Sequence, residues 1–146
     1  MRKQLYVTCL LIFLSAVVAS CGRKIIVDHY AIIPQPVEME TAEGSFTLSG
    51  STVCFLGNVG QNDPTVKYIS RVMRQWHFNP VFVGKPESNC LQFVINESPD
   101  IELGNEGYNL VVDNTGITIS ANTEHGLFYG FQTLVQLLPE DINNVR

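Results

Sequence analysis

The stretch that decides the fold is Gly107–Pro139, GYNLVVDNTGITISANTEHGLFYGFQTLVQLLP, near the end of the 146-residue chain. Apolar and polar residues alternate over 107–113 and again over 117–121, which is typical of strands with one buried face. Asn114-Thr115-Gly116 separates the two runs, and we expect Gly116 to supply the positive φ of a tight turn. The sequence therefore predicts a β-hairpin.

A helix over 124–138 follows the hairpin and ends before Pro139. Its apolar residues fall at helical spacing: Leu127, Phe128, Phe131, Leu134, Val135 and Leu138. Gly126 and Gly130 lie one turn apart and allow a neighbouring backbone to approach closely. Because no apolar run of membrane length surrounds them, we interpret the pair as tight packing on a sheet or domain, not as membrane dimerisation. His125 has no neighbouring nucleophile or carboxylate that would make it a general base, so a place on the helix surface is favoured.

The preceding residues predict a second helix and more strands. Asp63 as N-cap and Pro64 at the first helical position open a helix with apolar residues at Val66, Ile69, Val72, Met73 and Trp76. Met73 and Trp76 could form a ligand platform, but this spacing more often marks a core. The strand candidates are Ser45–Leu48, Thr52–Leu56, Val81–Val83 and Leu91–Ile95, and 32–39 reads as an extended segment whose prolines exclude it from the centre of a sheet. We predict an α+β domain with a largely antiparallel sheet and two helices on one face.

Residues 1–20 have the order of a bacterial secretory signal: a basic head, an apolar run and small residues before Cys21. Val18-Ala19-Ser20-Cys21 matches the lipobox of lipoproteins, in which the cysteine thiol is lipidated and becomes the first mature residue. An ordinary signal peptide or a transmembrane helix is the alternative, but an apolar run of about 14 residues is short for a span. We therefore expect an exported protein, anchored by Cys21 to a bacterial membrane on the periplasmic or cell-surface side, with 21–31 as linker.

Charge and composition limit the partners and cofactors. Residues 1–20 hold two of the nine basic residues and no acidic residue, so the remaining chain has a formal charge of −7. Its basic residues are scattered, which argues against a nucleic-acid partner. The acidic loop 96–106, with Glu97, Asp100, Glu102 and Glu106, lacks the fixed spacing of a calcium site and reads as a solvated loop. Without CxxC or HExxH spacing, the sequence predicts no metal site and no cofactor.

The domain retains two cysteines, Cys54 and Cys90, both in apolar surroundings. In an oxidising compartment they could form a disulfide. Two buried free thiols are an equally good interpretation, because the sequence does not give their separation.

Two motifs, taken together, resemble the N-terminal domain of the family 20 glycoside hydrolases, the β-N-acetylhexosaminidases. Ile33-Pro34-Gln35-Pro36, followed by Glu43-Gly44-Ser45-Phe46-Thr47-Leu48, is similar to the opening "IPxP…GxFxL" of that domain. The segment from Glu106-Gly107-Tyr108 to Leu138 is similar to its closing "GYxLxV…IxIxA…GxFYGxQTLxQLL". The resemblance covers 32–139, which we take as the domain.

This resemblance implies an accessory domain that precedes a catalytic (β/α)8 barrel and removes no sugar itself. In the family, the barrel supplies an adjacent Asp-Glu pair for substrate-assisted removal of terminal N-acetylhexosamine from glycans. The chain contains no Asp-Glu dipeptide, and Glu140-Asp141 has the reverse order, so no catalytic residue is assigned. We expect 140–146 to begin the link to a missing barrel. An accessory domain of a family 84 glycosidase and a standalone lipid-anchored binding or scaffold module are the alternatives.

Overall fold

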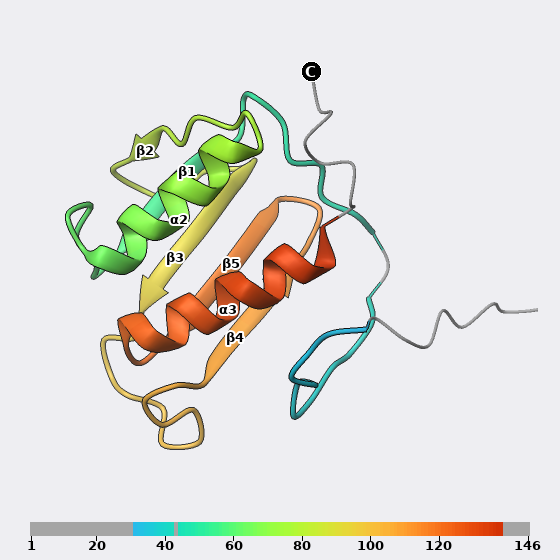
Figure 1. Cartoon of the computed structure of the whole chain (residues 1–146), viewed down its shortest axis with the longest axis vertical. Coiled ribbons are helices and arrows are strands. Elements are labelled where there is room, and N and C mark those ends of the chain that lie inside the picture. Colours follow the sequence, from blue (N-terminus) through green and yellow to red (C-terminus); the bar gives the residue numbers. More distant parts are fainter. Residues whose placement is uncertain (1–30, 43, 139–146) are drawn as a thin grey trace, which may run out of the picture. The chain divides into compact units, whose positions relative to one another are not determined.

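The computed structural model describes residues 31–42 and 44–138; the signal segment, Cys21 and 139–146 lie outside the described residues. In Figure 1 two helices cover the same face of one sheet, as predicted. The strands are β1 (Val53–Gly57), β2 (Phe82–Val83), β3 (Cys90–Ile95), β4 (Tyr108–Val112) and β5 (Gly116–Ala121), and the helices are α2 (Pro64–Gln75) and α3 (Glu124–Leu137). No helix in this part of the chain combines the length and apolar composition that a membrane crossing requires.

The sheet is mixed, with the strand order β2-β1-β3-β5-β4. β1 pairs in parallel with β2 and with β3, and β3 pairs in parallel with β5. Within the described residues, antiparallel pairing joins only β4 and β5, the predicted hairpin. The α+β class and the two-helix layer are thus confirmed, whereas the prediction of a largely antiparallel sheet is wrong.

The connections explain these strand directions. α2 joins β1 to β2, and a helical crossover brings the chain back in its original direction, so the two strands are parallel. β4 lies at the edge of the sheet and turns back through the hairpin, which places β5 beside β3 in parallel. Alternating apolar residues show that a strand has a buried face, but they do not show the direction of its neighbour.

The core lies between the sheet and the two helices. Alternate residues of the central strands face it, among them Cys54, Leu91, Phe93, Ile117, Ile119 and Ala121. Phe131 of α3 is fully buried, with its ring centroid 6.2 Å from that of Phe93 and 5.8 Å from that of Trp76. Burying such a side chain contributes about 1.5–3 kcal/mol. Met73 is also buried in this core and Trp76 packs against it, so the interpretation of both residues as core is confirmed.

Both helices begin directly after an N-cap residue, and the cap of α2 is the predicted Asp63. The Asp63 carboxylate accepts a hydrogen bond from the Thr65 N–H at 2.7 Å, and Pro64 is the first helical residue of α2. Thr123 is the N-cap of α3, and its hydroxyl oxygen accepts from the Gly126 N–H at 3.4 Å. These side chains satisfy backbone donors that the first helical turn leaves unpaired.

Asp113, not a glycine in the left-handed region, organises the hairpin turn. Its Oδ1 accepts hydrogen bonds from the Thr115 N–H at 2.7 Å, the Thr115 hydroxyl at 2.6 Å and the Gly116 N–H at 3.0 Å. Gly116 is not among the described residues with positive φ, so that prediction is wrong. Gly116 is needed for a different reason: a Cβ there would collide with the Cys90 carbonyl oxygen of β3.

The segment before β1 is held to the domain without joining the sheet. The predicted strand Ser45–Leu48 is not formed, because the Ser45 N–H donates to the Asn114 side chain at 3.1 Å instead of to a strand. Phe46 and Leu48 are partly buried and still pack against the core. The apolar pattern of this segment therefore reports burial and not strand pairing.

Gln136 of α3 fastens the beginning of the described chain. Its side-chain oxygen accepts from the Ile33 N–H at 2.9 Å, and its side-chain nitrogen donates to the Ile33 carbonyl at 3.1 Å. The neighbouring Ile32 is buried, with 6% of its surface exposed. We call this pair of hydrogen bonds the Gln136 clasp. It brings the start of the domain to the last turn of α3.

Candidate functional site

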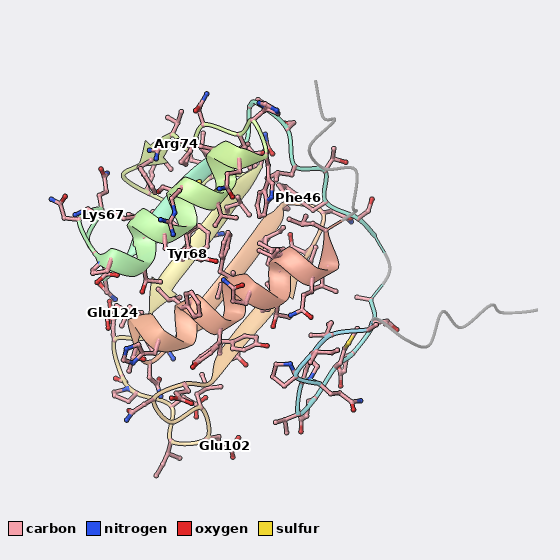
Figure 2. The ribbon with its side chains drawn as sticks, in the orientation of Figure 1. Phe46, Lys67, Tyr68, Arg74, Glu102 and Glu124 are labelled. Carbon is pink, nitrogen blue, oxygen red and sulfur yellow. The ribbon has the colours of Figure 1, made fainter. Side chains whose placement is uncertain are left out.

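The outer side of the helix layer, which faces away from the sheet, carries partly exposed aromatic side chains. The rings of Tyr68 on α2 and Phe128 on α3 lie 5.2 Å apart at an angle of 53°. Tyr129 is 44% exposed, and its ring lies 5.5 Å from that of Phe128. Figure 2 shows Tyr68 between the two helices. We call Tyr68, Phe128, Tyr129 and Gln132 the aromatic surface.

Contacts with neighbouring side chains hold Tyr68 in place. The Gln132 amide donates a hydrogen bond to the Tyr68 hydroxyl at 3.0 Å. The Tyr68 ring meets Phe131 edge-on, with centroids 6.4 Å apart, and the Arg71 guanidinium carbon lies 5.4 Å from the Tyr68 centroid. Rigid rings with polar tips are enriched in protein interfaces, and a side chain that is already fixed loses little entropy on binding.

Basic residues border the aromatic surface along α2. Lys67, Arg71 and Arg74 follow each other at four- and three-residue spacing, so they share one side of the helix, and all three are exposed. In Figure 2, Lys67 and Arg74 project from the side of α2 that lies away from α3. We call these three residues the cationic stripe. These residues are scattered in the sequence, and only their helical spacing indicates that they share one side of α2.

The glycine pair of α3 packs directly on the hairpin. At Gly126 a Cβ would collide with the Gly107 carbonyl oxygen and lie 2.7 Å from the Ala121 Cβ. At Gly130 it would lie 2.5 Å from a methyl group of Ile119 and 3.1 Å from the Tyr108 ring. The structure thus agrees with the expectation that the glycine pair allows close packing, and it shows that α3 packs closely on the sheet. Both glycines set the distance between α3 and β4–β5.

Cys54 and Cys90 are free and buried. In the parallel register Cys54 lies opposite Leu91, so Cys90, one residue before Leu91, points to the other face of the sheet. Burial raises the pKa of the Cys54 thiol to about 12, with a smaller contribution from Cys90. Burial also raises the pKa of Cys90. In this structure the two thiols form no disulfide, and both remain protonated and unreactive at neutral pH.

The Asn122 side chain organises the acidic loop. The Asn122 side-chain nitrogen donates to the carbonyls of Asp100 and Gly104 at 2.6 and 2.8 Å, and its oxygen accepts from the Asp100 N–H at 2.8 Å. The four carboxylate residues singled out in the sequence are all exposed: Glu97, Asp100, Glu102 and Glu106. Within residues 31–42 and 44–138, no three His, Cys, Asp or Glu side chains gather as metal ligands.

The remaining candidates lie elsewhere. His125 is exposed in the first turn of α3, consistent with helix surface. Cys21 and Glu140-Asp141 fall outside the described residues. The candidate site that the fold assembles is therefore the aromatic surface together with the cationic stripe.

Comparison with known proteins identifies relatives of this domain. The model of glycosyl hydrolase family 20, domain 2, matches residues 29–146. A curated Beta-hexosaminidase of Porphyromonas gingivalis is 26% identical over 153 aligned residues, which cover 99% of this chain and 19% of the relative. The chain thus spans about a fifth of that relative's length.

Solved structures share the fold. The GH20 β-N-acetylhexosaminidase of Streptomyces coelicolor superposes with a TM-score of 0.59 at 22% identity, over 74% of this chain and 21% of that one. The chitobiase of Flavobacterium johnsoniae gives a TM-score of 0.56 at 28% identity, over 75% of this chain and 18% of its own. In each case the matching part is a small fraction of a longer chain.

Proposed function

Because the chain belongs to glycosyl hydrolase family 20, as domain 2 of that family, we propose that it is the accessory domain of an exported β-N-acetylhexosaminidase. The parent enzyme would remove terminal N-acetylhexosamine from glycans with a separate (β/α)8 barrel. The observation that carries this proposal is the family match over 29–146, which includes all of the domain 32–139. The Porphyromonas gingivalis and Streptomyces coelicolor relatives, both described as hexosaminidases, support the activity of the parent.

The role of the domain in this proposal is to support the barrel through the outer side of the helix layer. The side of each helix that faces the sheet packs into the core. Tyr68 and Phe128, in contrast, are partly exposed to solvent, and Tyr129 is exposed. Covering such rings removes apolar area from water, at roughly 25 cal/mol per Å². Docking of a second domain would therefore stabilise both partners.

Glycan hydrolysis itself would belong to the barrel. Substrate-assisted hydrolysis needs a general acid beside the glycosidic oxygen and a second carboxylate that orients the acetamido group. In this chain the carboxylates of the acidic loop are exposed on the surface. In this proposal the accessory domain positions and stabilises the barrel and takes no part in the chemistry.

The reading frame that follows Arg146 in the genomic DNA tests the proposal. We expect it to encode a barrel with an adjacent Asp-Glu pair, and the complete polypeptide should release the aglycone from an aryl N-acetyl-β-glucosaminide. Deleting residues 32–138 from that polypeptide should lower its melting temperature. A reading frame without a barrel would contradict the proposal and favour the standalone binding module.

We also propose lipid anchorage through Cys21, which rests on the Val18-Ala19-Ser20-Cys21 motif. The several acyl chains of a bacterial lipoprotein hold a protein more firmly than one chain does. Labelled palmitate should enter the wild-type protein made in a bacterial host and be absent from Cys21→Ala. Equal labelling of the two proteins would disprove the anchor.

A further inference from the structure

We propose that the cationic stripe is an ionic border of the docking surface and that it binds carboxylates on the catalytic barrel. This inference rests on the proposed function, since it names the chemistry of the surface that the accessory domain would contact. Lys67, Arg71 and Arg74 would form ion pairs at the edge of the interface, while the aromatic surface fills its centre.

The charge distribution of the domain is the first argument. The described residues contain four basic side chains, Lys67, Arg71, Arg74 and Lys85, and ten acidic ones, Glu38, Glu40, Asp63, Glu87, Glu97, Asp100, Glu102, Glu106, Asp113 and Glu124. Three of the four basic residues therefore lie on one side of one helix. In an otherwise acidic domain, this concentration creates a local positive potential that favours a partner with negative charge.

Stability of α2 does not account for the stripe. Arg74 lies in the last turn, where a cation complements the helix dipole. Lys67 lies near the N-terminal end, where the same dipole disfavours a cation. Within the described residues, Arg71 packs its guanidinium over the Tyr68 ring, and no hydrogen bond or ion pair engages the side chains of Lys67 and Arg74.

The position of the stripe connects it to the aromatic surface. Tyr68 follows Lys67 directly and touches Arg71 through its ring face, so the two sets of residues are continuous across α2. Protein interfaces commonly have an aromatic centre, enriched in Tyr and Arg, with a polar border. The arrangement on this helix layer has that organisation.

Carboxylates on a protein fit this surface better than a nucleic acid does. Binding to a nucleic-acid backbone commonly involves roughly 6–10 phosphate contacts, and the stripe offers three cations beside the acidic groups of the same domain. A barrel surface needs to supply only two or three carboxylates at matching positions.

The test uses the complete polypeptide with a specific protease site inserted after Arg146, where cleavage reports the undocked state. The test variant is Lys67→Glu with Arg74→Glu, which leaves the Arg71–Tyr68 contact in place. The matched control is Lys85→Glu, an exposed lysine in the loop between β2 and β3. The variant Lys67→Gln with Arg74→Gln separates loss of charge from repulsion, and circular dichroism verifies that each protein is folded.

We expect slow cleavage of the wild type at low salt and faster cleavage as salt screens the ion pairs. The Glu variant should be cleaved at least about tenfold faster at low salt, the Gln variant at an intermediate rate, and Lys85→Glu like the wild type. A protected wild type whose cleavage depends on neither salt nor the stripe would overturn this inference and leave the proposed function intact. If no barrel is encoded, or if the wild type and all variants are cleaved rapidly at every salt concentration, docking itself fails.

Discussion

Gly126 shows at the scale of one residue why α3 lies so close to the hairpin. A methyl group there would meet a backbone carbonyl of Gly107 and the Ala121 side chain, neither of which can rotate away. At Gly130 the nearest atoms belong to side chains and not to the backbone: the Cγ2 methyl group of Ile119 and the Tyr108 ring. We therefore expect Gly130 to tolerate a larger side chain better than Gly126 does, although the sequence spacing does not distinguish the two positions.

Gly126→Ala should lower the free energy of unfolding by about 1–3 kcal/mol, because it overpacks a rigid contact. Gly130→Ala should cost less, because its Cβ meets side chains and no backbone carbonyl, and leucine at either position should cost more than alanine. Urea unfolding of the four variants measures this. Gly84→Ala is the control, because nothing lies within 4 Å of a Cβ at Gly84. Gly126→Ala with wild-type stability would contradict the close contact.

At the scale of the element, the hairpin depends on Asp113. Hydrogen bonds from the Thr115 hydroxyl, then from the Thr115 and Gly116 N–H groups, hold the pKa of the Asp113 carboxyl below its usual value. A carboxyl with a lowered folded-state pKa contributes stability above its unfolded pKa of about 3.9, and this contribution disappears as the pH falls through the folded value. Acid should therefore loosen the β4–β5 turn.

Asp113→Asn should be less stable than the wild type near neutral pH, because the uncharged amide is a weaker acceptor for these donors. The difference should shrink as the pH falls through the lowered folded-state pKa and the wild-type carboxyl is protonated. Urea unfolding near neutral pH and at a pH below that pKa measures it. A stability difference that does not change with pH would contradict the role of the charge.

The Gln136 clasp also acts between elements, because it joins α3 to the segment around Ile33. Gln136→Ala should increase hydrogen exchange of the amides around Ile33, because their partner is lost. The control Gln132→Ala removes the neighbouring amide, which is bonded to Tyr68 instead, and should leave the exchange at Ile33 unchanged. Equal exchange in Gln136→Ala and the wild type would show that Ile32 burial alone holds the segment.

At the scale of the whole molecule, the purified 146-residue chain should not hydrolyse aryl N-acetyl-β-glucosaminides. Its acidic loop presents carboxylates to solvent, and hydrolysis needs an acid positioned against a bound sugar. Release of nitrophenol, compared with a heat-inactivated sample, measures the activity. Turnover that is lost when Glu97, Asp100, Glu102 or Glu106 is changed to its amide would contradict the accessory role.

The sequence by itself determined the local elements of this domain. Asp63-Pro64 located the start of α2, the alternation in 107–121 located the hairpin, and the closing motif identified the family. These features could be predicted because capping, periodicity and glycine spacing act over a few neighbouring residues. The apolar pattern at Ser45–Leu48 correctly indicated burial of this segment. It did not indicate a strand, because a buried segment outside the sheet has the same pattern.

Only the tertiary structure decided which strands are neighbours and which side chains meet. The parallel pairing of β1 with β3, the opposite faces of Cys54 and Cys90, and the contact of Gly116 with Cys90 all depend on strand register. The aromatic surface likewise arises because α2 and α3 pack side by side, which brings Tyr68 to Phe128 across 60 positions of sequence. Such contacts are set by the shape of the whole core, because many arrangements of the same strands and helices satisfy the local pattern equally well.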